Sequence, residues 1–221
     1  MTGLEVLAAE VTGCERCPRL RAHCLEIARV KRRAYRDQEY WGRPVPGFGD
    51  PQARLLILGL APGAHGANRT GRMFTGDRSG EFLFRALHET GFASHAESVS
   101  REDGLRLTDC YITASARCAP PDNKPTPEEV RQCRPYLERE LAMLRPLVVV
   151  ALGRLAFDNY WSLKGIRGGN FGHGVASKTG ESWLIASYHP SQQNTQTGRL
   201  TAEMLRGVFE QARNFLEESA G

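Results

Sequence analysis

Four short runs of apolar residues set the strongest limit on how this chain can fold. They cover residues Arg54–Leu60, Thr108–Ala114, Leu147–Leu152 and Ser182–Tyr188. Runs of this length that are apolar at nearly every position are typical of strands buried on both faces of a sheet. We therefore expect these four segments to be neighbouring strands at the centre of the molecule.

Helical patterns fall between the predicted strands. Ser79–Thr90 keeps one apolar face and stops at Gly91. Thr126, with Pro127 next and Glu129 three residues on, forms a capping box that predicts a helix start. A last amphipathic helix is predicted over Thr201–Leu216. Strands that alternate with helices indicate a parallel sheet covered on both faces, in which ligands bind at the carboxyl ends of the strands.

The length and composition favour one folded domain over residues 1–221. Hydrophobic residues make up 41% of the 221 and charged residues 24%, which is ordinary for a globular protein. No apolar run approaches the roughly 20 residues that span a bilayer, and the first residues do not resemble a signal peptide. We expect a cytoplasmic monomer that does not associate with membranes.

The net charge of +4 and a pI near 8.8 hint at a polyanionic partner. Basic residues cluster over Arg29–Arg33 and at Arg36. The same cluster is also compatible with an ordinary solvated helix face.

The six cysteines do not suggest disulfides in a cytosolic chain. Cys14 and Cys17 form a C-x-x-C pair, Cys118 follows the second predicted strand, and Cys133 lies on the apolar side of the next helix. If the N-terminal segment packs there, four thiolates could bind zinc or an iron–sulfur cluster, and spacing alone does not separate the two. Unrelated packing cysteines are a third interpretation, and Cys110 is expected in the core.

The loop after the first strand, residues 59–77, is the first candidate for chemistry. Its five glycines allow close approach of the backbone to a ligand. Phe74 could stack on a planar base or simply anchor the loop in the core. Asp77 precedes a predicted helix start, where the helix dipole would keep it ionised, although acids are common at helix N-termini.

The loop after the fourth strand is the second candidate. His189 stands at the carboxyl end of this strand and is followed by Pro190 and a polar stretch, Ser191–Asn194. A histidine so placed is able to face a ligand, and a purely structural role is the alternative.

Three segments resemble the uracil-DNA glycosylase superfamily, in particular its iron–sulfur branch and family five (type B). They are residues Gly59–Asp77, Cys118–Pro127 and Tyr188–Leu200, and Trp41–Asp50 is also similar. The resemblance covers most of the chain from Cys14 onward. It implies a three-layer α/β/α sandwich with a four-stranded parallel central sheet, and monofunctional base-excision repair of DNA.

The resemblance also implies a [4Fe–4S] cluster with a structural role in an N-terminal ligand segment. Its cysteine ligands would be Cys14, Cys17, Cys118 and Cys133. The substrate would be damaged double- or single-stranded DNA, from which the enzyme flips and releases uracil.

Roles for the site residues follow from the resemblance and from the chemistry of base release. Asp77 would orient water or stabilise the sugar cation, His189 would face the base oxygen, and Asn123 would hold water or the base. Phe74 would stack on the base. The base edge would meet backbone amides around the turn of Ala61, Pro62 and Gly63. Ser191, Gln192, Gln193 and Asn194 would enter the minor groove, although such wedges usually have bulkier side chains.

Two departures from family four bear on specificity. That family has an acid where this chain has Leu60, and an asparagine that reads uracil where this chain has Ala114. Because Ala114 lacks the hydrogen bonds that reject other bases, we expect a broader substrate range that includes hypoxanthine and ethenocytosine.

Two other functions fit parts of the pattern. One is a small-molecule nucleosidase or phosphate-binding hydrolase, although the glycine-rich loop lacks the Gly-Lys-Ser/Thr ending of a P-loop. The other is a non-catalytic iron–sulfur protein that binds damaged DNA.

Overall fold

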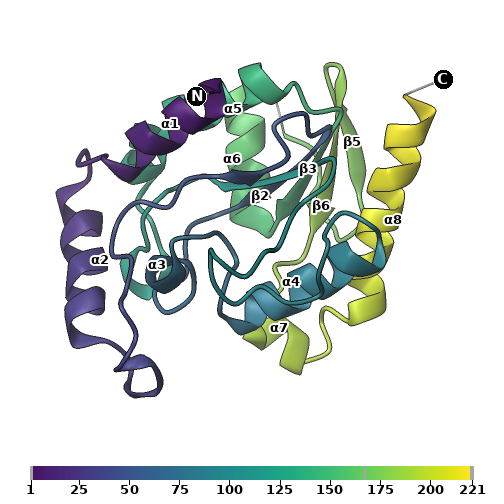
Figure 1. Ribbon diagram of the computed structural model, residues 1–221. Coiled ribbons are helices and arrows are strands. Elements are labelled where there is room, and N and C mark those ends of the chain that lie inside the picture. Colours follow the sequence, from purple (N-terminus) through teal and green to yellow (C-terminus); the bar gives the residue numbers. More distant parts are fainter. Residues whose placement is uncertain (1, 167, 220–221) are drawn as a thin grey trace.

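The sheet at the centre of the molecule has six strands, of which the middle four are parallel (Figure 1). The computed structural model describes residues 2–166 and 168–219. The strand order is β1-β3-β2-β4-β6-β5. Their bounds are β1 Phe48–Gly49, β2 Leu55–Gly59, β3 Cys110–Ala114, β4 Val148–Leu152, β5 Ala176–Thr179 and β6 Ser182–Ser187.

The four predicted strands are confirmed, and they are parallel neighbours as expected. The sheet is larger than predicted because antiparallel strands β1 and β5 flank the parallel four. Strand β5 lies in the stretch Lys164–Gly180, where the sequence shows no apolar run. Ser177 is half-buried and Lys178 is exposed, since an edge strand need not be buried on both faces.

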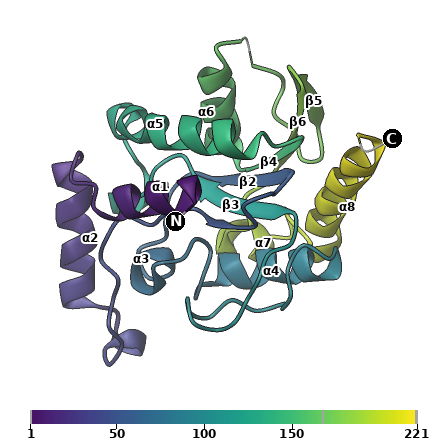
Figure 2. The same cartoon turned by 45° about the horizontal axis from the view of Figure 1, so that its top comes forward.

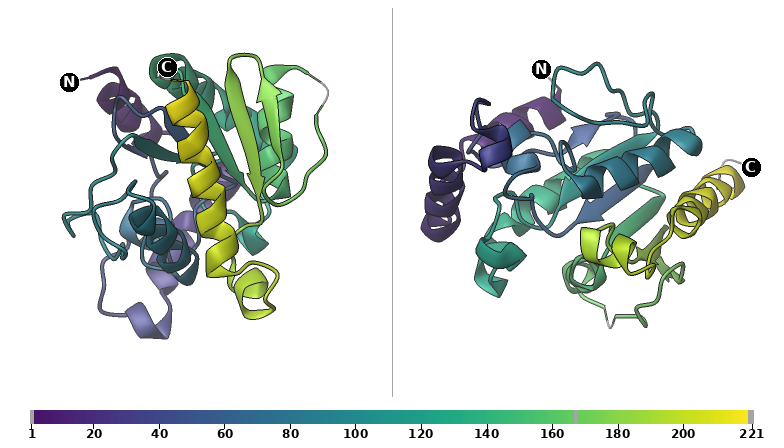
Figure 3. Two further views of the ribbon diagram at one scale, coloured as in Figure 1. Left: turned by 90° about the vertical axis from the view of Figure 1, so that its right-hand side faces the viewer. Right: turned by 90° about the horizontal axis from the view of Figure 1, so that it is seen from below.

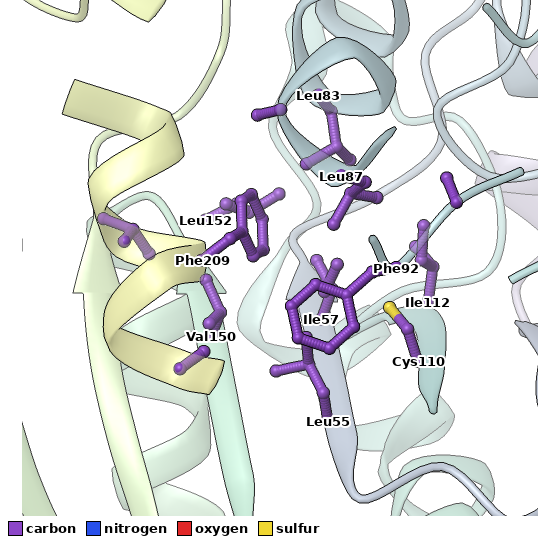
Figure 4. Close-up of a cluster of buried hydrophobic side chains, with 14 of the residues drawn as sticks. Leu55, Ile57, Leu83, Leu87, Phe92, Cys110, Ile112, Val150, Leu152 and Phe209 are labelled. Carbon is purple, nitrogen blue, oxygen red and sulfur yellow. The ribbon is translucent and has the colours of Figure 1, made fainter. Parts of the chain in front are cut away.

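Helices cover both faces of the sheet, so the predicted three-layer α/β/α architecture is confirmed (Figure 2). On one face lie α4 (Arg78–Glu89) and α8 (Ala202–Glu218). On the other lie α5 (Pro127–Leu144) and α6 (Arg154–Lys164). Figure 4 shows the first core, where Leu83 and Leu87 of α4 and Phe209 of α8 approach Ile57 and neighbouring strand residues.

The N-terminal helices lie at one side of this sandwich (Figure 1). Helix α1 (Gly3–Thr12) contacts α5, and α2 (Pro18–Val30) contacts the short helix α3 (Figure 3). The remaining short elements are η1 Arg33–Tyr35, α3 Ala67–Thr70, η2 Pro121–Asn123 and α7 Gln192–Gln196. Within residues 2–166 and 168–219, none of the helices has the length and apolar character to cross a membrane.

The predicted caps form as the sequence indicates. Thr126 accepts a hydrogen bond from the Glu129 N–H, and the Glu129 side chain accepts from Thr126 N–H, so the capping box is complete. Asp77 caps α4 and Thr201 caps α8. These caps fix where each helix begins, and the cap of α4 places Asp77 at the carboxyl edge of the parallel strands.

Candidate active site

The glycine-rich loop after β2 folds tightly around the Asp77 side chain. A methyl group on Gly66 would stand 1.9 Å from Asp77 Oδ2, and one on Gly63 would stand 3.0 Å from the same oxygen. Any residue larger than glycine at position 66 would therefore displace the carboxylate. The loop residues Ala61 and Pro62 lead directly into this contact at the end of β2.

Asp77 is half-buried, and its carboxylate both caps α4 and lies against the glycine-rich loop after β2. Its Oδ1 accepts a 2.9 Å hydrogen bond from the Gly80 N–H at the start of α4. Burial raises the pKa of Asp77 above its ordinary value, and hydrogen bonds from the Gly80 and Ser79 N–H groups oppose the rise only in part. We expected the helix terminus to keep this carboxyl ionised at neutral pH. The hydrogen bonds from the start of α4 act in that direction, and burial acts against them.

Phe74 lies between the ends of β2 and β6. Its backbone has a φ of +52°, an uncommon conformation for a non-glycine residue. A methyl group on Gly59 would meet the Phe74 ring at 3.0 Å, so the ring packs directly on the last residue of β2. The ring centroid is 6.0 Å from that of His189, with the planes inclined by 34°.

The Phe74 backbone is held by the first turn of α4. A methyl group on Gly80 would lie 1.8 Å from the Phe74 carbonyl oxygen, so only glycine allows this approach. Glycines at positions 59 and 80 thus allow the close contacts of the aromatic ring and its backbone.

His189 follows β6 and lies against the start of α6. A methyl group on Gly153 would be 3.3 Å from His189 Cβ. Burial lowers the pKa of His189 from 6.5 to about 4, so its imidazole is neutral at physiological pH. The Asn194 side-chain amide donates to the His189 carbonyl at 2.9 Å, which ties the loop after β6 to α7. A neutral imidazole is able to donate one N–H to a base oxygen without itself carrying charge.

Strand ends thus bring together several residues that lie far apart in the sequence. Ala114 is the last residue of β3 and is paired with Gly59 in register. Phe74 joins the end of β2 to His189. Asp77 follows Phe74 by three residues and lies against Gly63 and Gly66. The Asp77 and His189 side chains therefore approach the same edge of the sheet.

Other predicted residues take positions that the sequence did not indicate. Asn123 is exposed at the end of η2 with φ +55°, next to Asp122 with φ +53°. The polar stretch expected to enter the minor groove forms the short helix α7, capped by Ser191, whose hydroxyl accepts from the Asn194 N–H. Gln192 and Gln193 are exposed, and Asn194 is half-buried in its contact with the His189 carbonyl.

Arg69 is a structural residue of this site that sequence reasoning missed. It is 9% exposed, and its guanidinium donates to the carbonyls of His65 at 2.8 Å and of Gly76 at 2.6 Å. It thereby ties both ends of the loop that carries Phe74. A single arginine in a polar loop gives no pattern in the sequence, so this role appears only once the loop is folded.

The four predicted cysteine ligands gather where the N-terminal segment meets the main sandwich. Cys17 packs against the buried group Leu20, Cys24, Cys118 and Ala119. Burial raises the pKa of Cys17 to about 11, with smaller contributions from the nearby Cys133 and Cys14 thiols. Burial raises the pKa of Cys133 as well, and Cys14 acts in the same direction.

The donor set of four cysteine thiols has the chemistry of an iron–sulfur cluster or of a zinc site. In the described part of the chain, no three or more His, Cys, Asp or Glu side chains converge on a point where one metal ion would bind. Cys133 acts electrostatically on both Cys17 and Cys118, and Cys14 acts on Cys17. These thiols lie near one another, which an all-cysteine iron–sulfur cluster would require.

The two remaining cysteines differ from each other. Cys110 is fully buried in β3 and belongs to the first core, as expected (Figure 4). Cys24 is also buried, and its thiol donates to the Ala119 carbonyl at 3.6 Å. The Asn68 side-chain amide donates to the Cys24 carbonyl at 3.3 Å, so helix α2, which carries Cys24, supports the loop after β2.

Of the basic cluster, only Arg29 lies on helix α2, and Arg32, Arg33 and Arg36 follow in and around η1, all exposed. Arg29 pairs with Glu26 at 2.7 Å. A separate hollow of about 700 Å³ lies between α1, β1 and Arg101, and its lining includes none of the predicted site residues.

The model of the uracil DNA glycosylase superfamily matches residues 46–213. The chain belongs to this superfamily. Its predicted identity as a member is thereby confirmed.

The relatives place the chain in one branch of the superfamily. It is 52% identical over 213 residues to a type-5 uracil-DNA glycosylase of Thermus thermophilus, a match that covers 95% of this chain and 96% of that protein. A type-5 enzyme of Mycobacterium tuberculosis is also 52% identical over 213 residues, covering 94% of this chain and 80% of that protein. A type-4 uracil-DNA glycosylase of Archaeoglobus fulgidus is 38% identical over only 120 residues, 54% of this chain and 53% of that protein.

Proposed function

We propose that this chain is a monofunctional DNA glycosylase of base excision repair that hydrolyses the N-glycosidic bond of uracil in DNA. The observation that carries the proposal is the Asp77 carboxylate and the neutral His189 imidazole at one edge of the sheet, with the Phe74 ring beside them. Membership of the superfamily and the type-5 relatives support the same function.

The reaction needs a stabilised cation on the sugar and a stabilised anion on the departing base. Asp77 is suited to the sugar side, because a carboxyl with a raised pKa is a stronger base toward the attacking water. His189 is suited to the base side, because it is neutral and donates a hydrogen bond to the oxygen that gains negative charge. Phe74 would stack on the flipped ring.

The surrounding residues would hold the flipped nucleotide. Backbone amides of the segment Ala61–Gly63 would contact the base edge, and Asn123 would support water or the base from η2. The exposed side chains of Gln192 and Gln193 on α7, beside Ser191 and Asn194, would enter the minor groove and occupy the place of the flipped nucleotide.

We propose a substrate range wider than uracil alone. The small side chain of Ala114 ends β3 beside Gly59, so it leaves the base edge without a hydrogen-bonding reader at that position. Hypoxanthine and ethenocytosine would then be accepted together with uracil.

We propose that Cys14, Cys17, Cys118 and Cys133 hold a [4Fe–4S] cluster. When bound, the cluster would supply four iron–thiolate links that fasten the N-terminal segment to β3 and α5. The chain's own contribution is to support the catalytic loop from this point, since Ala64 packs on the buried group of Cys24, Cys118 and Ala119. The protein would work in the cytoplasm as a monomer on double- and single-stranded DNA.

A base-release assay with matched duplexes tests this function. Duplexes that carry uracil, hypoxanthine or ethenocytosine at one position are incubated with wild-type protein and with Asp77→Asn. We expect release by the wild type, at least about 100-fold slower release by the variant, and equal DNA binding by both.

Three other outcomes would contradict the proposal in separate ways. Binding to damaged DNA without base release would favour a damage-binding protein. Cleavage of free deoxyuridine with no action on DNA would favour a nucleosidase. Full activity of Asp77→Asn would remove the assignment of the carboxylate.

A further inference from the structure

Arg117 is a buried cation beside the cysteines that the proposed function does not use. It is 1% exposed and lies between strand β3 and Cys118. Its carbonyl accepts a 2.7 Å hydrogen bond from the Val45 N–H, which helps to fix the backbone at this position. A guanidinium removed from water to this degree requires partners for its charge and for its N–H groups.

One partner of Arg117 is Glu140 of helix α5, which is itself 1% exposed. Arg117 Nη2 donates to Glu140 Oε2 at 2.5 Å, and the Thr113 hydroxyl donates to the same oxygen at 2.7 Å. This ion pair satisfies only one edge of the guanidinium. Nε and Nη1 of Arg117 are buried and have no hydrogen-bond partner among the described residues.

The proposed cluster ligands lie next to this arginine. Cys118 is the following residue in the chain. Cys133 is buried on α5 two helical turns before Glu140, on the same face of the helix. Because Arg117 pairs with Glu140, its guanidinium lies against the face of α5 that carries Cys133, and two of its donors stay unsatisfied.

We infer that the positive charge of Arg117 balances the negative charge of the iron–sulfur cluster. Its Nε–H and Nη1–H, which have no partner among the described residues, would donate hydrogen bonds to sulfur atoms of the cluster. This inference rests on the proposed cluster, which goes with the proposed function. A four-thiolate cluster carries net negative charge, and hydrogen bonds to its sulfurs raise its reduction potential. Arg117 would therefore stabilise the reduced form and slow loss of iron.

The test separates Arg117 from its ion pair with Glu140. Removing Arg117 alone would leave a buried carboxylate without a counter-charge, which strongly destabilises a fold, whereas Glu140→Gln leaves a guanidinium that the cluster would still balance. We therefore compare Glu140→Gln with the double variant Arg117→Met, Glu140→Gln. The glutamine still accepts the Thr113 hydroxyl, so the two proteins differ in the guanidinium alone.

Three measurements are made on protein purified without oxygen: iron and sulfide content, the midpoint potential, and the rate of iron loss to a chelator. We expect the double variant to favour the oxidised form about tenfold more than Glu140→Gln, which is ~59 mV lower for a one-electron couple. Iron loss should be faster by a similar factor. Far-UV circular dichroism of both variants checks that each is folded.

A matched exposed pair provides the control. Arg139 of α5 pairs with Glu10 of α1, and both side chains are nearly half exposed. The variant Arg139→Met, Glu10→Gln should leave the potential and the iron-loss rate unchanged, because solvent screens that pair.

The outcomes distinguish this inference from the proposal beneath it. Suppose that Glu140→Gln and the double variant both bind iron and have the same midpoint potential and iron-loss rate. This result would overturn the role of Arg117 and leave the cluster in place. A wild-type protein without iron and sulfide would overturn the cluster and the inference together. Base release from uracil-containing DNA is measured separately and reports on the glycosylase proposal.

Discussion

Replacement of Gly66 by alanine should remove most activity while the fold survives. The added methyl group would stand 1.9 Å from Asp77 Oδ2 and 2.6 Å from its Cγ. Ordinary van der Waals contact begins at 3.4 Å, so the carboxylate would have to move by about 1.5 Å to make room for the methyl group.

The size of the effect follows from the displacement. A misplacement of about 1 Å in a reacting group costs roughly 100-fold in rate, so base release should fall by about 100-fold to 1,000-fold. If the displaced Asp77 also loses its bond to the Gly80 N–H, the cap of α4 is lost at a cost of about 1 kcal/mol. For a chain of this size that lowers Tm by roughly 2–4 °C.

The assay is single-turnover release of uracil from a labelled duplex, with thermal unfolding measured on the same samples. Gly63→Ala, whose methyl group would stand 3.0 Å from Asp77 Oδ2, should lose less activity than Gly66→Ala. Gly207→Ala is the control, because that position on α8 has open space for a methyl group. Activity of Gly66→Ala within twofold of the wild type would refute the argument that the position of Asp77 is decisive.

Asp77→Asn should reduce base release by at least about 100-fold with little change in Tm, since asparagine also caps helices. His189 binds a proton near pH 6.5 in the unfolded chain but only near pH 4 in the folded chain. The free energy of unfolding should therefore fall as the pH is lowered from 6.5 to 4. In urea unfolding, His189→Gln should remove roughly 1–3 kcal/mol of that fall. Ala114→Asn should raise the preference for uracil over hypoxanthine at least about tenfold in the base-release assay. Asp103→Asn leaves buried Arg72 without its charged partner and should cost about 3 kcal/mol in urea unfolding.

Contrary results would count against specific steps of the reasoning. A large drop in Tm for Asp77→Asn would mean that its activity loss reports folding. An identical pH dependence of stability in wild type and His189→Gln would mean that His189 is protonated alike in both states. Unchanged selectivity of Ala114→Asn would remove that residue from substrate choice.

The central strands could be predicted from the sequence because burial on both faces requires apolar residues at nearly every position. Val148–Leu152 is apolar at every position, and all five residues are buried. Helix α5 was predicted to begin at Thr126 because the capping box depends only on residues three apart. Strands β1 and β5 could not be predicted, since each lies at an edge, is short, and has half-exposed positions.

The site was predicted in part for an equally physical reason. Strand ends in a parallel sheet meet at one edge, so His189 and the loop before Asp77 could be placed together in advance. The raised pKa of Asp77 could not, because it depends on how closely Gly63 and Gly66 enclose the carboxylate. Nor did any pattern single out Arg69 or Arg117, whose roles depend on carbonyls and carboxylates distant in sequence.

The antiparallel hairpin at one margin of the sheet has a practical consequence. Strands β5 and β6 are joined at Gly180 and Glu181, at the amino end of β6, whereas His189 follows its carboxyl end. Gly180 has φ +71° and open space around it. A dye or surface tether attached at Glu181 would thus lie at the opposite end of β6 from His189. This turn is therefore a suitable attachment point for single-molecule studies of how the protein moves along a duplex.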